Sequence, residues 1–181
     1  MNNDKITIDN LVFNKYIKEQ DIIDKISQLS TELNKFYHNK NPLVIGVLNG
    51  CIYFMMDLLK IVDFSYSIDF IKAKSYKGMK SGNLNIQSSI NPEQITGKYI
   101  LIVEDIIDSG NTMKSIYSYI EKCNPKDIKI ISLLTKVDQI SSELSIDWYG
   151  FQIENNYVIG YGLDYNNLFR NLKDIYKINE E

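Results

Sequence analysis

The fold is decided by one segment, Tyr99-Ile100-Leu101-Ile102-Val103-Glu104-Asp105-Ile106-Ile107-Asp108-Ser109-Gly110-Asn111-Thr112. Its first five residues form an unbroken apolar run rich in β-branched side chains, which is typical of a parallel strand buried on both faces. Apolar residues then recur at helical spacing, at Met113, Ile116, Tyr117 and Ile120. The polar residues in between therefore lie at the carboxyl end of a sheet, where α/β proteins bind ligands.

The polar part of this segment, which we expect to form a loop after Val103, has two chemically different halves. Glu104 and Asp105 are adjacent carboxylates, which repel one another unless a metal ion, a lysine or a polyol shares their charge. The second half, Asp108 to Thr112, is a turn that leads into a helix whose first N–H groups are unpaired, so it can cradle an anion. Gly110 lets the backbone come close, and the Ser109 and Thr112 hydroxyls add donors. Together the halves suit a sugar phosphate.

The ten residues from Val103 to Thr112 resemble the phosphoribosyl-diphosphate motif of the hypoxanthine-guanine phosphoribosyltransferases. The resemblance implies an α/β chain of the type I phosphoribosyltransferase class, with a central, mostly parallel sheet flanked by helices. It also implies a small hood from the C-terminal and N-terminal residues. We expect one domain over residues 1–181, with the hood including about 148–181.

The same resemblance assigns roles within the motif. Glu104 and Asp105 would hold the ribose hydroxyls and, with Asp164, a Mg²⁺ ion. Asp108 would be the general base or acid beside the purine N7. The loop that binds the 5-phosphate would comprise Asp108, Ser109, Gly110, Asn111 and Thr112.

A second buried strand is predicted over Leu43 to Leu48, followed by Asn49-Gly50 and a helix. From local sequence alone, Asn49-Gly50 is only a turn. By resemblance it is the diphosphate loop, formed by Leu48, Asn49 and Gly50, in which a non-proline cis peptide is tolerated for function. Asn49 stands where the family carries a lysine.

A third strand, Ser67 to Ala73, is predicted nearer the sheet edge, and a polar stretch with two glycines follows it. Ser75-Tyr76 at its start resembles the catalytic lid that closes over the reacting sugar; the alternative is a surface β-ribbon. A further strand over Ile128 to Leu134 places Lys136 at the same sheet edge as the acidic motif. A lone lysine there is usually solvated, but by resemblance Lys136 contacts the exocyclic oxygen of the purine.

The end of the chain is aromatic and β-prone, at Tyr149-Gly150-Phe151 and from Tyr157 to Tyr165. On its own it would be an antiparallel hairpin with Asp164 as a turn residue. By resemblance it is the base-binding hood. Tyr157, where the family usually has phenylalanine, would stack on the purine, and Val158 would recognise the base edge through its backbone. Asp164 would hold magnesium beside the purine, and Arg170 would clamp diphosphate.

Composition limits the function classes. The chain has 181 residues, a net charge of −3 and a hydrophobic fraction of 44%, which fits one ordinary globular domain without the basic excess of a nucleic-acid binder. No secretory signal or membrane-spanning run is present, so we expect a cytoplasmic protein without a membrane partner. One histidine and two separated cysteines favour neither a Ser-His-Asp triad nor a zinc site.

The resemblance therefore predicts a purine-salvage enzyme that joins hypoxanthine or guanine to phosphoribosyl diphosphate with Mg²⁺, as a homodimer or homotetramer. The preference among hypoxanthine, guanine and xanthine is open. Another base, or an RNA-binding regulator of the same fold, is the alternative, although the net negative charge does not favour RNA. A signalling receiver domain would place its paired acids after the first strand and its phosphorylated aspartate on another strand. Here all three acids follow one strand.

Overall fold

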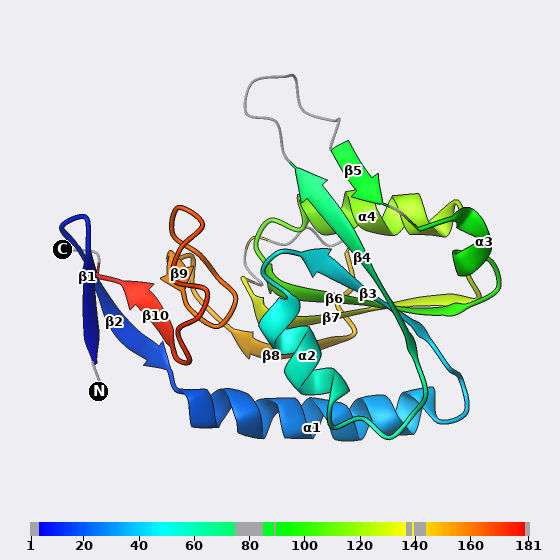
Figure 1. The fold of residues 1–181 in the computed structure, drawn as a ribbon, viewed down its shortest axis with the longest axis horizontal. Helices are drawn as coiled ribbons and strands as arrows, with labels where there is room; N and C mark the ends of the chain where they lie inside the picture. The colour runs from blue at the N-terminus through cyan, green and yellow to red at the C-terminus, as the bar shows by residue number, and fades with distance from the viewer. Residues whose placement is uncertain (1–3, 75–84, 89, 137–138, 140–143, 180–181) are drawn as a thin grey trace.

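The structure, a computed structural model, describes residues 4–74, 85–88, 90–136, 139 and 144–179. Within them the chain forms a six-stranded sheet, flanked by helices, and a separate four-stranded sheet that carries both termini at one end of the molecule (Figure 1). The elements, in chain order, are β1 (Lys5–Ile8), β2 (Leu11–Ile17), α1 (Glu19–Tyr37), β3 (Leu43–Leu48), α2 (Ile52–Leu59), β4 (Ser67–Lys74), β5 (Asn85–Ser88), α3 (Pro92–Ile95), β6 (Tyr99–Ile107), α4 (Asn111–Glu121), β7 (Asp127–Thr135), β8 (Trp148–Gln152), β9 (Val158–Ile159) and β10 (Ile175–Ile178).

The large sheet has the order β5-β4-β3-β6-β7-β8. All neighbouring strands are parallel except β5, which runs antiparallel to β4 at one edge. The chain moves from β3 toward one edge of the sheet and from β6 toward the other, so the strand order reverses between these two central strands. Ligand sites of open α/β sheets lie at such a switch point, outside the carboxyl ends of the strands.

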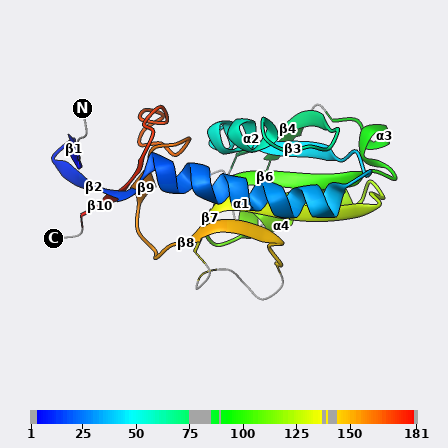
Figure 2. The ribbon, with the colours of Figure 1, turned by 90° about the horizontal axis from the view of Figure 1, so that it is seen from below.

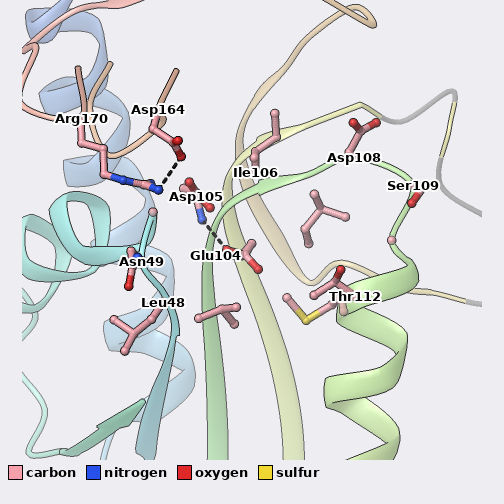
Figure 3. A pocket seen from close by; sticks show the side chains of 15 residues that line it. Leu48, Asn49, Glu104, Asp105, Ile106, Asp108, Ser109, Thr112, Asp164 and Arg170 are labelled. Carbon is pink, nitrogen blue, oxygen red and sulfur yellow. Dashed lines mark hydrogen bonds and ion pairs between the residues drawn. The ribbon is translucent and has the colours of Figure 1, made fainter. Parts of the chain in front are cut away.

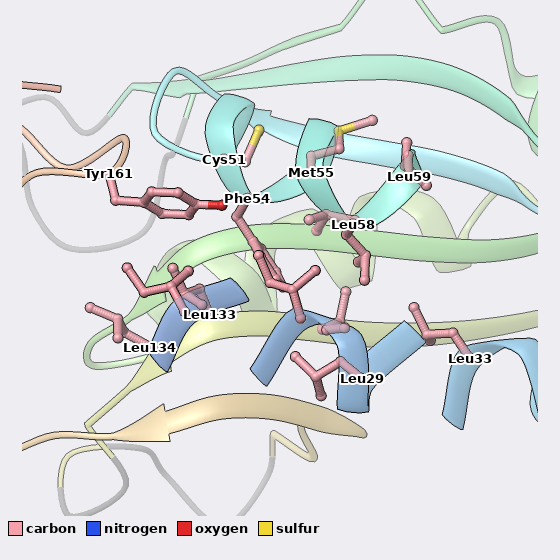
Figure 4. Close-up of a cluster of buried hydrophobic side chains, with 14 of the residues drawn as sticks. Leu29, Leu33, Cys51, Phe54, Met55, Leu58, Leu59, Leu133, Leu134 and Tyr161 are labelled. Atoms are coloured by element: carbon pink, nitrogen blue, oxygen red, sulfur yellow. The ribbon is translucent and has the colours of Figure 1, made fainter. Parts of the chain in front are cut away.

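Both faces of the large sheet are buried, which explains the unbroken apolar runs of its central strands. In β6, Leu101 and Val103 pack into one cluster with α1 and α2, whereas Ile100 and Ile102 pack into the other with α4. Figure 4 shows the first cluster, where side chains of α1 and α2 meet those of β7. Helices α1 and α2 therefore cover one face of the sheet and α4 covers the other (Figure 2). The prediction of a mostly parallel sheet between helices is confirmed.

Strand β6 is longer than the sequence predicted. We expected it to end at Val103, with Glu104 and Asp105 in a loop, but it continues to Ile107. Its pairing with β3 stops at Gly46↔Val103, whereas its pairing with β7 continues to Ile107↔Thr135. Glu104 and Asp105 therefore lie on a part of β6 that pairs with β7 but not with β3.

The hood differs from its predicted boundary. We expected it to begin near residue 148, but β8 (Trp148–Gln152) pairs in parallel with β7 and belongs to the large sheet. Trp148 and Phe151 of this strand pack against the main core, and the Phe36 and Trp148 rings are 5.3 Å apart. The hood is instead the four-stranded sheet with its loops. This sheet has the order β1-β2-β10-β9 and joins the N-terminal strands to the C-terminal ones.

No helix in the described part of the chain is long and apolar enough to cross a membrane.

Candidate active site

A pocket of about 290 Å³ lies at the carboxyl edge of β3 and β6, below the loops of the hood (Figure 3). Its walls come from the end of β3, the end of β6 with the start of α4, and the hood. The lining residues include Leu48, Asn49, Gly50, Glu104, Asp105, Asp108, Ser109, Gly110, Thr112, Asp164 and Arg170. The fold thus gathers residues from three distant parts of the sequence.

The acidic pair is nearly buried. Glu104 is 8% exposed and Asp105 is 9% exposed, and the Asp105 backbone N–H donates to Glu104 Oε1 at 3.2 Å. Burial and then the neighbouring charge of Asp105 raise the pKa of Glu104 well above its ordinary value of 4.5. Burial also raises the pKa of Asp105. Among the described residues neither carboxyl group forms an ion pair, so a bound cation or several hydrogen-bond donors would favour their ionised forms.

The raised pKa of Glu104 predicts a pH effect on the ligand-free protein. Between the unfolded-state pKa near 4.5 and the higher folded-state pKa, the folded protein binds more protons, so raising the pH through this interval lowers the free energy of unfolding. Glu104→Gln keeps the size but removes the titration. We therefore expect wild type to lose more stability than Glu104→Gln between pH 5 and pH 8 in urea unfolding. The exposed control Glu121→Gln should follow wild type. Identical pH dependence of the stability of all three proteins would show that the pKa of Glu104 is not raised in the folded state.

The predicted phosphate loop forms the start of α4. Gly110 precedes the helix in the left-handed region at φ 76°, where glycine is favoured, and its carbonyl accepts the first helical hydrogen bond from the Lys114 N–H at 2.9 Å. Ser109 and Thr112 line the pocket, as expected. Asn111, the first residue of the helix, is exposed and is not among the lining residues, so its assignment to the anion site has no support from the pocket.

The predicted diphosphate loop has the expected backbone, because the Leu48–Asn49 peptide bond is cis. Gly50 lies against Asp105, and a Cβ at this position would collide with the Asp105 carboxylate. Gly162 of the hood has φ 100°, and a Cβ there would collide with the Gly50 carbonyl oxygen. Two glycines therefore let the diphosphate loop, the acidic pair and the hood approach one another.

A second pocket, of about 230 Å³, adjoins the first and lies between β6, the end of β7 and the hood. It is lined by Asp105, Ile106, Asp108, Lys136, Asn156, Tyr157, Val158, Leu163 and Asp164. All four residues predicted to bind the purine are in this set, and four of its lining residues also line the first pocket.

Lys136 is 8% exposed and reaches Asp108. Its Nζ donates to Asp108 Oδ2 at 3.0 Å and to Asn155 Oδ1 at 3.1 Å. Its backbone N–H donates to the Ile107 carbonyl at 3.0 Å, which fixes the residue to the end of β6. A solvated surface lysine, the alternative from the sequence, is therefore ruled out. Sequence reasoning missed Asn155, which sits in a polar loop without a local signal.

Aromatic rings form the hood side of the second pocket. Tyr157 is 48% exposed, its hydroxyl donates to the Asp164 carbonyl at 2.8 Å, and its ring meets the Phe13 and Tyr165 rings edge-on at 6.5 and 6.1 Å. Val158 is buried in β9 and pairs with Lys177 of β10. Phe13, supplied by β2, was also missed, because a single apolar residue near the N-terminus carries no sign of contact with residue 157.

Asp164 and Arg170 form an ion pair on the hood side of the first pocket (Figure 3). The Asn167 N–H donates to Asp164 Oδ2 at 2.8 Å, and Arg170 donates to the Gly162 carbonyl. The charge of Arg170 also lowers the pKa of Asp105, against the larger effect of burial. Within the described residues no three acidic, histidine or cysteine side chains form a cluster that could hold a metal by themselves. The predicted lid residues, Ser75 and Tyr76, lie outside the described residues.

Three features together define a phosphoribosyltransferase site. They are the acidic end of β6, the anion-binding turn at the start of α4, and the hood that covers the pocket. In agreement, the family model described as "Phosphoribosyl transferase domain" matches residues 14–166. The receiver-domain alternative is excluded by this match and by the placement of Glu104, Asp105 and Asp108 at the end of one strand.

The chain belongs to the hypoxanthine-guanine phosphoribosyltransferase family. It is 42% identical over 156 residues to the hypoxanthine-guanine-xanthine phosphoribosyltransferase of Tritrichomonas foetus, covering 85% of each chain. It is 36% identical over 167 residues to the hypoxanthine-guanine phosphoribosyltransferase of Streptococcus pneumoniae, covering 91% of this chain and 92% of that one. A crystal structure of a hypoxanthine phosphoribosyltransferase from Staphylococcus aureus superposes with a TM-score of 0.85 at 33% identity, over 92% and 91% of the two chains.

The fold is thus the type I phosphoribosyltransferase fold, and the chain is a transferase of purine salvage. These relatives are named as enzymes, which does not favour the RNA-binding alternative.

Proposed function

We propose that the two adjoining pockets together transfer the 5-phosphoribosyl group from phosphoribosyl diphosphate to hypoxanthine or guanine. The products are the nucleoside monophosphate and diphosphate. One observation carries the proposal: the pocket with the anion cradle and the pocket with Lys136 and Tyr157 share Asp105, Ile106, Asp108 and Asp164. A sugar phosphate in one pocket and a purine in the other would meet at this shared wall.

In the proposed reaction the bond between ribose C1 and the diphosphate oxygen breaks, and a bond from C1 to a purine nitrogen forms. Positive charge develops on the ribose, which preorganised carboxylates can stabilise. Glu104 and Asp105 would accept hydrogen bonds from the ribose hydroxyls, and the loop from Asp108 to Thr112 would bind the 5-phosphate. Asp108 would exchange the proton at purine N7, since it lines both pockets.

The donor set fits Mg²⁺, a hard cation that takes oxygen ligands and retains water or substrate oxygens. Glu104 and Asp105 supply buried carboxylates without an ion-pair partner among the described residues, and Asp164 faces the same pocket. These three residues do not form a closed metal cluster, so they would hold the ion together with water and substrate oxygens. When bound, it would neutralise charge on the diphosphate leaving group. Arg170 would add its planar guanidinium to diphosphate binding, and the Leu48-Asn49-Gly50 loop would contribute backbone contacts.

For the base, Lys136 would donate to the exocyclic C6 oxygen, Tyr157 would stack on the ring, and Val158 would recognise the base edge through its backbone. Asp164 would lie beside the base. Tyr157 is half-exposed and lines the second pocket, which supports the stacking role.

The test is a panel of hypoxanthine, guanine, xanthine, adenine and uracil, each assayed with phosphoribosyl diphosphate with and without Mg²⁺. We expect turnover of at least one 6-oxopurine, dependent on Mg²⁺, and poor use of adenine and uracil. Turnover restricted to adenine or to a pyrimidine, or no turnover of any base, would contradict the proposal.

Asn49→Lys provides a test of the diphosphate loop. Asn49 lines the pocket and supplies no charge, so we expect a lysine there to strengthen binding of diphosphate or phosphoribosyl diphosphate. An exposed or partly exposed pair contributes roughly 0.2–1 kcal/mol, and the gain should shrink at high salt. Asn49→Gln is the matched uncharged control. Affinities measured by titration that are unchanged for both ligands at low and high salt would show that the missing charge has no role.

We propose a homodimer or homotetramer in the cytoplasm. In the hypoxanthine phosphoribosyl transferase of Trypanosoma cruzi, a structural relative, the C-terminal region has a role in the oligomeric state and enzymatic activity of that protein. Light scattering after gel filtration would give the assembly size.

The proposed closure of Ser75 and Tyr76 over the sugar would be tested by Tyr76→Ala, which should reduce kcat.

A further inference from the structure

Lys136 has an amide neighbour that no assigned role uses. An ammonium group has three N–H donors. In this structure Asp108 Oδ2 accepts one at 3.0 Å and Asn155 Oδ1 accepts another at 3.1 Å. This arrangement leaves one donor for a third acceptor on the pocket side.

The backbone around Asn155 is held against the same strand end as Lys136. The Ile153 N–H donates to the Thr135 carbonyl at 2.9 Å, and the Ile153 side chain is 6% exposed. The Asn156 N–H donates to the Glu154 carbonyl at 2.8 Å, which closes a tight turn at residue 155. Ile153 therefore anchors the chain before the turn, and the turn presents the amide of the exposed Asn155 to Lys136.

The two acceptors differ in what the reaction requires of them. Asp108 is 54% exposed at its side chain and lines both pockets, so a purine whose N7 meets Asp108 competes with Lys136 for this carboxylate. Asn155 is not a lining residue of either pocket and can keep its hydrogen bond while the base is bound. A flexible lysine side chain without such a partner would lose rotamer freedom when it binds the base.

We infer that Asn155 is a positioning residue, which holds the Lys136 ammonium so that its remaining donor points to the C6 oxygen of the purine. This inference rests on the proposed function and adds to it the residue that sets the lysine's orientation. Asn155 acts through Lys136 and does not itself contact the base.

The test compares Asn155→Leu, which keeps the approximate size and removes the acceptor, with Asn155→Asp, which keeps an acceptor oxygen. Loss of a hydrogen bond to a charged group corresponds to about a tenfold effect. We expect Asn155→Leu to raise KM for hypoxanthine about tenfold, with KM for phosphoribosyl diphosphate changed less than about twofold. Asn155→Asp should restore most of the affinity for the base. Gln152→Ala, an exposed substitution on the same segment, is the control and should behave as wild type.

A double-mutant cycle that combines Asn155→Leu with Lys136→Ala separates a positioning role of Asn155 from a merely structural one. Once Lys136 is gone, Asn155→Leu should raise KM for hypoxanthine no further. An equal increase in both backgrounds, equal changes in both KM values, or no change in either would overturn the inference. If Asn155→Leu does not fold, Asn155→Ser, whose hydroxyl is too short to reach Lys136, replaces it with the same expectations. Inactivity of wild type toward every 6-oxopurine would instead refute the proposed function, so the two failures are distinguishable.

Discussion

Asp108→Asn lowers kcat by about 10²–10⁴ while the protein stays folded, if Asp108 moves the proton at purine N7. The amide has nearly the size of the carboxylate and still accepts one hydrogen bond, but it cannot take the proton. The substitution also weakens the contact with Lys136. Because the Asp108 side chain is 54% exposed, that loss should cost only roughly 0.2–1 kcal/mol of stability, too little to mimic the catalytic effect.

The measurement is single-turnover kinetics, which isolates the chemical step from product release, together with thermal unfolding of both proteins. Asp24→Asn, on the solvent side of α1, is the matched control and should leave both quantities unchanged. A single-turnover rate for Asp108→Asn close to that of wild type would show that another group transfers the proton.

The second large effect concerns discrimination against adenine. An ammonium donates hydrogen bonds and cannot accept them, so Lys136 suits the C6 carbonyl of hypoxanthine and opposes the C6 amino group of adenine. Lys136 is 8% exposed, so an unmatched donor there is costly. Rejection of a base that cannot make a hydrogen bond on which the site depends can reach about 10⁴.

Lys136→Ala should therefore reduce kcat/KM for hypoxanthine far more than it changes the already poor value for adenine. Both bases are measured with both proteins, and Lys98→Ala, an exposed lysine just before β6, serves as the matched control. Comparable wild-type values for the two bases, or a ratio that survives the substitution, would rule out this role for Lys136.

Local patterns were sufficient to predict the central strands. The apolar runs of β3 and β6 reflect burial on both faces, and the helical spacing after residue 112 matches α4. The end of β6 could not be predicted in this way, because it is set by pairing with β7 as far as Ile107↔Thr135. Local sequence shows where a chain is suited to a strand, whereas the length of the strand depends on its neighbour.

The hood boundary was wrong for a related reason. The segment from 148 to 152 has the same aromatic, β-prone composition as the hood, and its membership of the large sheet depends on pairing with β7. Likewise, contacts between residues distant in sequence carry no local signal. The packing of Phe13 against Tyr157 and the hydrogen bond from Lys136 to Asn155 are of this kind.

Within the site, motif resemblance supplied the residues, and the structure supplied their arrangement. Lys136 and Asp108 were assigned separate roles, and their 3.0 Å contact emerged only from the fold. That contact links the group proposed to select the base to the group proposed to move its proton. A purine entering the second pocket must therefore share or replace it.

Phosphoribosyl transfer to hypoxanthine is tested by the mass balance of one reaction. Purified protein is mixed with hypoxanthine, phosphoribosyl diphosphate and Mg²⁺, and the products are separated and quantified. Phosphoribosyl transfer at this site predicts one inosine monophosphate and one diphosphate for each hypoxanthine consumed, with formation strongly reduced in Asp108→Asn. Release of diphosphate without the nucleotide, or nucleotide formation that Asp108→Asn leaves unchanged, would contradict it.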